Sequence, residues 1–256
     1  MIYERPFLQD VQGIDNAGIL ANCTRVCAIA YYDKVDLNAK TILTKDSCCN
    51  LNLPDDSYSI FQQEKYFIRC SGYAINGFQV LTTAHGLDPS FDGYVVFDFY
   101  NCSNTPVPRF CHFSSTDITK FSHLGSYEYD FAIINFREPI IKETLFDVEA
   151  FSKSASTNYA IGFPLGMKAV VSFAKDDTLE EEFPFFFMFL DMFSGSSGSP
   201  VFNKYHQFIG LFRTTTAADF VEDGSKLNFV VLPKVIPQKS KTIIMERMIT
   251  NTLKSI

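Results

Sequence analysis

Ser194-Gly-Ser-Ser-Gly-Ser-Pro-Val-Phe-Asn203 is a loop of serine and glycine that runs through Pro200 into an apolar strand. A loop of this composition can hold a reactive serine. An unassisted serine hydroxyl is a weak nucleophile, however, and acyl transfer also needs an adjacent base and hydrogen-bond donors that face the developing oxyanion. Alone, the segment is equally typical of a flexible turn, so its interpretation depends on what the rest of the chain supplies.

Two other segments supply a base and an acid. Leu81-Thr-Thr-Ala-His85 is an apolar strand that ends in a histidine, and Tyr129-Asp-Phe-Ala-Ile-Ile-Asn-Phe136 is an apolar strand headed by Asp130. A buried carboxylate is costly unless it is paired, and a histidine N–H is a suitable partner, although an exposed aspartate at the strand start would need none. The other histidines lack such a setting, and we expect surface or structural roles for His112, His123 and His206.

The three segments together resemble the trypsin/chymotrypsin-like serine proteases. The loop is similar to their Gly-x-Ser-Gly-[Gly/Ser]-Pro pattern, the histidine strand to their Thr-Ala-His, and the aspartate strand to their Asp-[Ile/Phe]-Ala-[Leu/Ile]-[Leu/Ile]. The resemblance is strongest to compact bacterial members of the glutamyl-endopeptidase-like and high-temperature-requirement-like kinds. It implies a serine endopeptidase in which Ser197 is the nucleophile, His85 the general base and Asp130 the residue that orients the base.

The order of the three residues agrees with this resemblance. It is histidine, aspartate, serine, whereas α/β-hydrolases place the serine first within Gly-x-Ser-x-Gly, and here Ser199 stands two residues after Ser197. The resemblance further implies an oxyanion hole formed by the backbone N–H groups of Gly195 and Ser197. It covers roughly residues 24–235, since residues 160–166 and 208–212 are similar to a turn and a pocket strand of bacterial members.

Short runs rich in β-branched and aromatic residues, separated by Gly, Pro, Asn and Asp, predict an all-β fold. Candidate strands fall into two sets of six: residues 26–32, 65–75, 78–84, 94–100, 107–113 and 130–136, then residues 158–163, 169–174, 183–193, 200–203, 208–213 and 227–233. We therefore expect two six-stranded antiparallel β-barrels of the chymotrypsin-like type. Residues 1–145 would carry His85 and Asp130, and residues 146–256 would carry Ser197.

Local signals add two turns and a helix. Asn76-Gly77 predicts a two-residue hairpin turn through its tolerance of positive φ, and residues 203–207 predict a longer hairpin. Residues 239–256 place their apolar side chains on one helical face, at Ile244, Met248, Ile249 and Leu253. We expect a C-terminal amphipathic α-helix that docks on the second strand set, with a membrane-surface helix as the alternative.

Charge and hydropathy exclude several partners. The net charge of −7 leaves no basic surface for nucleic acid. Residues 1–6 lack the basic-then-apolar pattern of a secretory signal, and the most apolar stretch, residues 183–193, is too short to span a bilayer. We therefore expect a soluble chain with no membrane span, whose partner is a peptide or protein substrate. The oligomeric state is left open.

Cysteine usage indicates the compartment. The seven cysteines are an odd number, which favours free thiols in a reducing compartment such as the cytoplasm, with non-classical secretion left open. Gly86 agrees, because it replaces the cysteine beside the histidine in secreted animal members. A zinc site is the alternative for Cys23, Cys27, Cys48 and Cys49, but an adjacent pair fits known ligand spacings poorly. We expect no metal and no cofactor.

The specificity pocket departs from the relatives. Phe212 stands where glutamyl enzymes carry a pocket histidine. An ungapped count from Ser197 puts Asp191 at the pocket base, which favours basic side chains, whereas Arg213 would favour acidic ones, so the P1 preference stays open. An extended peptide is expected to add as a strand beside residues 213–215. We assign substrate contacts to Asp191, Phe212, Arg213 and Thr214.

Activation and activity itself carry alternatives. Ser196 stands where animal members have an aspartate that captures a newly freed N-terminus, so the unprocessed chain is expected to form the oxyanion hole. One rival interpretation is a catalytically inactive peptide-binding module that kept the fold. The other is a structural scaffold with an incidental Gly/Ser loop, which predicts that His85 and Ser197 lie too far apart for a hydrogen bond.

Overall fold

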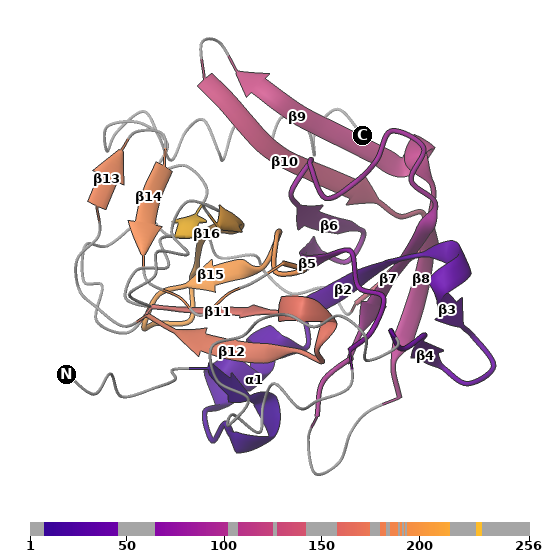
Figure 1. Ribbon diagram of the computed structural model, residues 1–256, viewed down its shortest axis with the longest axis horizontal. Coiled ribbons are helices and arrows are strands. Elements are labelled where there is room, and N and C mark those ends of the chain that lie inside the picture. The colour runs from indigo at the N-terminus through magenta and orange to yellow at the C-terminus, as the bar shows by residue number, and fades with distance from the viewer. Residues whose placement is uncertain are drawn as a thin grey trace.

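Two large antiparallel β-sheets make up most of the described chain. The computed structural model describes residues 8–45, 65–101, 107–124, 127–141, 158–174, 180–182, 185–188, 190, 192, 194–215 and 229–231. The first sheet has seven strands in the order β8-β7-β2-β5-β6-β10-β9 (Figure 1). Its strands are β2 (Val26–Tyr31), β5 (Cys70–Asn76), β6 (Gln79–Thr82), β7 (Gly93–Phe97), β8 (Arg109–Phe113), β9 (Ile118–Leu124) and β10 (Tyr127–Asn135).

The second sheet has eight strands in the order β1-β12-β11-β15-β16-β17-β14-β13. They are β1 (Leu8–Asp10), β11 (Tyr159–Gly162), β12 (Val170–Phe173), β13 (Glu180–Glu182), β14 (Phe185–Met188), β15 (Pro200–Phe202), β16 (Phe208–Thr215) and β17 (Phe229–Val231). A small separate hairpin pairs β3 (Val35–Asp36) with β4 (Thr41–Ile42). Figure 1 shows the strands of the two large sheets on opposite sides of the molecule.

The expected all-β antiparallel fold is confirmed, but six strands in each barrel are not. The three residues of β1 add an edge strand to the second sheet, because they pair with β12 from Leu8↔Ser172 to Asp10↔Val170. So short a segment has no readable apolar alternation. The proposed boundary near residue 145 and the expected helix over residues 239–256 lie outside the described residues. The N-terminal strand β1 nevertheless belongs to the second sheet.

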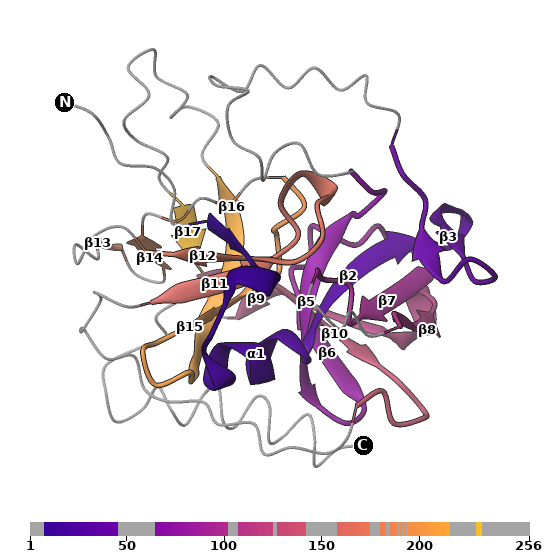
Figure 2. The same cartoon turned by 90° about the horizontal axis from the view of Figure 1, so that it is seen from below.

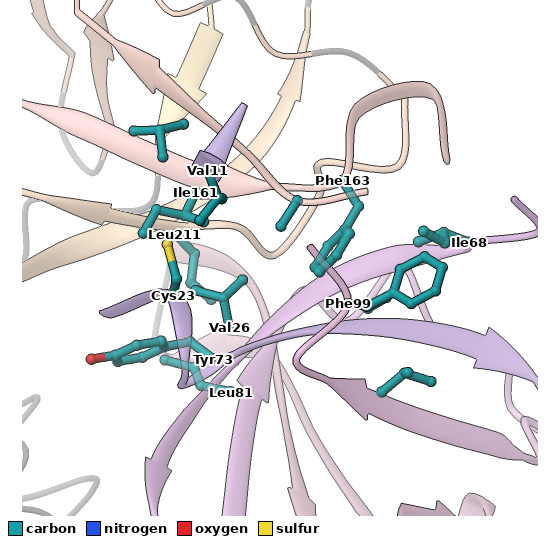
Figure 3. Close-up of a cluster of buried hydrophobic side chains, with 14 of the residues drawn as sticks. Val11, Cys23, Val26, Ile68, Tyr73, Leu81, Phe99, Ile161, Phe163 and Leu211 are labelled. Atoms are coloured by element: carbon teal, nitrogen blue, oxygen red, sulfur yellow. The ribbon is translucent and has the colours of Figure 1, made fainter. Parts of the chain in front are cut away.

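A hydrophobic cluster joins the two sheets. Val26 and Tyr73 come from the first sheet and Ile161 and Leu211 from the second, and all four are at most 2% exposed. Figure 3 shows these side chains gathered between the strands of both sheets. Burying an aliphatic side chain of this size contributes about 1.5–3 kcal/mol relative to leaving it exposed. The shared core therefore holds the loops of one sheet in a fixed position against those of the other.

The two predicted hairpins are present, although the first turn differs in detail. Its two loop residues are Gly77 and Phe78, and Asn76 pairs with Gln79. Neither Asn76 nor Gly77 has positive φ. The Asn76 side chain instead accepts a hydrogen bond from the Phe78 amide at 2.8 Å, which closes the turn. In the second hairpin, Asn203 Oδ1 accepts from the amides of the turn in the same way.

The short helix α1 (Ala17–Cys23) lies in the chain between β1 of the second sheet and β2 of the first sheet. Asn16 caps it by accepting from the amides of Gly18 and Ile19 at 3.0 and 3.2 Å. The Asn22 amide group then donates to the Tyr159 hydroxyl at 3.0 Å. Figure 2 shows α1 below the strands, between those of the two sheets. Within the described residues, no helix has the length and apolar character needed to cross a membrane.

Candidate active site

The pairing of β6 with β10 brings His85 and Asp130 together. Ala132 lies opposite Thr82 in this register, so Asp130, two residues earlier on β10, lies opposite the residues that follow β6. The Ala84 amide donates to the Asp130 carbonyl at 3.3 Å. The next amide, that of His85, donates to Asp130 Oδ1 at 2.8 Å. The register of β6 against β10 therefore places His85 beside Asp130.

The Asp130 carboxylate is buried, and each of its two oxygens has a hydrogen-bond partner. Its side chain is 9% exposed, and Oδ2 lies 2.5 Å from His85 Nδ1. The same Oδ2 accepts a hydrogen bond from Arg213 Nε at 3.0 Å. Burial raises the pKa of Asp130, but the hydrogen bonds and charge of His85, with the hydrogen bond from Arg213, outweigh burial and hold the pKa below its ordinary value. The ionised carboxylate fixes the orientation of the imidazole.

The second ring nitrogen of His85 faces a serine that belongs to the second sheet. His85 Nε2 lies 3.0 Å from Ser197 Oγ, which belongs to the loop before β15. Asp130, His85 and Ser197 thus form one continuous line of hydrogen-bonding side chains. This distance contradicts the scaffold interpretation, which required His85 and Ser197 to lie too far apart for a hydrogen bond. In this arrangement His85 can accept the Ser197 proton while Asp130 stabilises the resulting positive charge.

The serine loop is anchored to β5 by Ser71, a residue that the sequence analysis did not single out. The Ser71 amide donates to the Ser197 carbonyl at 2.7 Å, and the Ser71 hydroxyl donates to the Gly195 carbonyl at 2.9 Å. Ser71 is completely buried, and its Oγ also accepts from the Phe163 amide at 3.3 Å. The available sequence signal for this contact was a serine within a largely apolar run.

Two glycines give the loop its shape. Gly195 has φ +95°, and a Cβ there would lie 2.6 Å from the Phe163 carbonyl oxygen. Gly198 has φ +86°, and a Cβ there would lie 2.1 Å from the Ser71 carbonyl oxygen. No other residue type fits these conformations and distances without displacement. Among the described residues, no acceptor takes a hydrogen bond from the backbone amide of Gly195 or Ser197, the two groups expected to form the oxyanion hole.

The sequence matches the family model of the trypsin-like peptidase domain over residues 70–211, more than half of the chain. The chain belongs to this family. No curated protein sequence matches it significantly. The matched residues include His85, Asp130 and Ser197.

Solved structures confirm the chymotrypsin-like fold of this trypsin-like peptidase. The active form of the Rv3671c protease from M. tuberculosis is similar with a TM-score of 0.52 and 14% identity, covering 96% of this chain and 91% of that one. A Glu endopeptidase in complex with MPD is similar with a TM-score of 0.53 and 13% identity, covering 94% and 95%. At such identities the likeness shows the fold alone.

Ser196 of the trypsin-like peptidase is buried, directly before Ser197 in the chain. It is 0% exposed, and its hydroxyl has no hydrogen-bond partner among the described residues. Ser199 shares both properties, and a Cβ on Gly162 would lie 1.8 Å from its Oγ. A neutral hydroxyl at Ser196 cannot form the ion pair with an N-terminal amine that an aspartate forms. Activation without N-terminal processing therefore stays a prediction consistent with this position.

The residues expected to contact substrate do not form one group in the structure. Phe212 is 1% exposed and packs in a cluster with Leu190 and Met192, so its side chain belongs to the core. Arg213 was expected to offer its charge to an acidic substrate, but its guanidinium contacts Asp130 instead. Thr214 is part of β16. Asp191 lies outside the described residues.

Near Ser197, the strand β16 extends beyond the end of its pairing with β15. The last pair with β15 is Pro200↔Leu211, whereas pairing with β17 on the other side continues to Thr215↔Phe229. The strand passes beside the Ser197 loop, since the Gly198 amide donates to the Phe212 carbonyl at 2.8 Å.

The remaining candidates lie away from the site. His112 is paired with Asp92 at 2.6 Å, and His206 Nδ1 lies 2.9 Å from the Tyr159 hydroxyl, which makes the former a surface and the latter a structural residue. The His123 side chain lies outside the described residues, as do Cys48 and Cys49. The described cysteines are free thiols: Cys23, Cys27, Cys70 and Cys111. Within the described residues, no group of three or more His, Cys, Asp or Glu is arranged to hold a metal ion.

Proposed function

We propose that this trypsin-like peptidase is a serine endopeptidase that hydrolyses peptide bonds through an acyl-enzyme. The observation that carries the proposal is the 3.0 Å separation between His85 Nε2 and Ser197 Oγ, with Asp130 held on the opposite ring nitrogen. Geometry of this kind activates an otherwise weak nucleophile.

The proposed reaction proceeds in two halves. His85 Nε2 takes the Ser197 proton as Oγ attacks the scissile carbonyl, and the tetrahedral oxyanion is stabilised by the amides of Gly195 and Ser197. The imidazolium then gives its proton to the leaving amine, which departs and leaves the acyl-enzyme. A water molecule, deprotonated by His85, attacks the acyl carbonyl, and the returning proton regenerates the Ser197 hydroxyl as the acid product leaves.

The proposed substrate is an extended peptide segment. The extension of β16 to Thr215, beyond its last pair with β15 at Leu211, supports this, because a peptide laid beside this part of the strand would form main-chain hydrogen bonds and carry its scissile bond towards Ser197. Main-chain binding of this kind fixes register before side chains determine preference. The P1 preference is left to profiling with a peptide library.

A fluorophosphonate probe tests the proposal. We expect covalent labelling of the full-length wild-type chain, none of Ser197→Ala, and wild-type labelling of Ser196→Ala, a matched control because Ser196 is the adjacent serine with no described hydrogen-bond partner. The mass of the labelled peptide identifies the modified serine. Wild-type protein that is not labelled, or labelling of Ser197→Ala to the same extent, would contradict the hydrolase proposal. It would favour the inactive peptide-binding module instead.

A further inference from the structure

Arg213 is a charged residue directed at the acid of the site. Its Nε donates to Asp130 Oδ2 at 3.0 Å, and its side chain is 26% exposed. The same oxygen lies 2.5 Å from His85 Nδ1. A carboxylate oxygen has two lone pairs, so the guanidinium and the imidazole together fill Oδ2. The second oxygen, Oδ1, accepts from the His85 amide at 2.8 Å.

We propose that Arg213 is a positioning residue that shares the negative charge of Asp130 with His85, and thereby keeps His85 neutral and able to act as a base at lower pH than a neutral residue 213 would allow. The inference rests on the proposed function, because His85 matters as a base only in the hydrolase. Arg213 would then act on the hydrogen-bonded line of Asp130, His85 and Ser197, and its side chain would not select the substrate.

The physical reason lies in the shared oxygen. An arginine is always charged, so it partly neutralises the Asp130 carboxylate at every working pH. Protonation of His85 would then set a second positive charge against the oxygen that the guanidinium already holds. A second positive charge nearby disfavours the protonated form of a histidine, whereas an ionised carboxylate that contacts no other cation favours that protonated form. Arg213 thus weakens the attraction between the Asp130 carboxylate and a protonated His85, and this attraction would otherwise favour protonation of His85 at mildly acidic pH.

Other charged and titratable groups near the pair contribute less. On β5, burial raises the pKa of Cys70 to about 12, so this thiol stays neutral. Arg69 donates to the Gly86 carbonyl and its guanidinium lies 3.8 Å from Asp88 Oδ1, with both side chains at least 40% exposed to solvent. On β9, the Lys120 ammonium donates to the Leu87 carbonyl. Among the described residues, Arg213 is the cation that contacts the Asp130 carboxylate.

The test compares pH profiles of kcat/KM for the full-length chain and its variants. In Arg213→Gln, which keeps a hydrogen-bond donor and removes the charge, we expect the half-maximal pH of the acid limb to rise by about one unit, about a tenfold loss of activity well below that pH. Arg213→Lys keeps the charge and is expected to keep the wild-type limb. Arg69→Gln, which removes a neighbouring cation that does not touch Asp130, is the matched control and should also keep it.

The outcomes distinguish charge sharing from a structural role. An unchanged acid limb in Arg213→Gln overturns the inference, even where the plateau rate or the stability falls. Equal shifts in the glutamine and lysine variants also overturn it, because the planar guanidinium rather than its charge would then be responsible. A shift of the same size in Arg69→Gln would reduce the effect to general surface charge and overturn the specific role.

A second measurement separates this inference from the proposed function. The His85 ring signal can be titrated by NMR in Ser197→Ala, with His85→Gln used to assign it, and compared with the same titration after Arg213→Gln. A rise of about one pH unit in the midpoint supports charge sharing whether or not the chain hydrolyses peptides. An unchanged midpoint in a chain that does hydrolyse peptides refutes the inference while the hydrolase proposal stands.

Discussion

Ser71 holds Ser197 from across the join of the two sheets, because its amide donates to the Ser197 carbonyl at 2.7 Å. Its hydroxyl reaches the Gly195 carbonyl of the same loop at 2.9 Å. A single residue of the first sheet thus supports the Ser197 loop of the second sheet at two backbone carbonyls.

Replacement of Ser71 by alanine removes the hydroxyl bridge and leaves a buried carbonyl and a buried amide without their partner. We expect a loss of unfolding free energy of about 1–3 kcal/mol, measured by urea denaturation. We also expect kcat/KM to fall roughly ten- to a hundredfold, because the loop is positioned less accurately. Ser199→Ala is the matched control, since this buried hydroxyl has no described partner, and its stability should equal or exceed that of the wild type. Equal effects of both variants would contradict the bridge.

Replacement of Gly198 by alanine tests the shape of the loop. The new Cβ would lie 2.1 Å from the Ser71 carbonyl oxygen in a residue with φ +86°, so the loop must shift. We expect kcat/KM to fall at least about a hundredfold, with an unchanged circular dichroism spectrum. Gly13→Ala is the control, because no atom lies within 4 Å of its added Cβ. Wild-type activity in Gly198→Ala would show that the serine does not depend on this conformation.

The sequence was sufficient to predict that His85, Asp130 and Ser197 lie together, because each occupies a short contiguous segment at the end or start of an apolar strand. Their meeting follows from the register of neighbouring strands and from a resemblance that spans most of the chain. The all-β class followed equally from local runs of β-branched and aromatic residues.

Contacts between distant segments could not be read in the same way. Arg213 and Asp130 are 83 positions apart, and no local pattern links them. A signal did exist: a charged residue directly after the apolar run of β16 needs a partner, and Asp130 was already expected to be a buried carboxylate. Ser71 carried less information, since one serine in an apolar strand has many explanations. The strand β1 was missed because three residues cannot display a period.

Buried cysteines offer a prediction that does not depend on activity. Burial raises the pKa of Cys23 and of Cys70 to about 12, so at pH 8 only about one part in ten thousand of either thiol is ionised. We expect neither to react with iodoacetamide in the native protein at pH 8 and both to react after denaturation in urea, as measured by peptide mass spectrometry. Cys111, which is partly exposed, is expected to react first among the described thiols. Rapid native labelling of Cys70 would contradict its burial beside Gly86.

The pH dependence of stability should report the Asp130 carboxylate. Burial raises its pKa, and the interactions with His85 and Arg213 lower it further than burial raises it, so the folded value lies below the unfolded one. A group of this kind stabilises the folded state above the unfolded pKa, about 4 for aspartate, and the stabilisation is lost as the pH falls through the folded value. We expect Asp130→Asn to be less stable than the wild type at pH 7 and the difference to shrink steadily below about pH 4.

Urea unfolding of both proteins between pH 3 and pH 7 measures this difference in stability. Asp33→Asn is the control, because Asp33 is an exposed aspartate whose partner, Lys34, is its chain neighbour. A difference that stays constant down to pH 3 would show that the asparagine acts through packing and not through the lost charge.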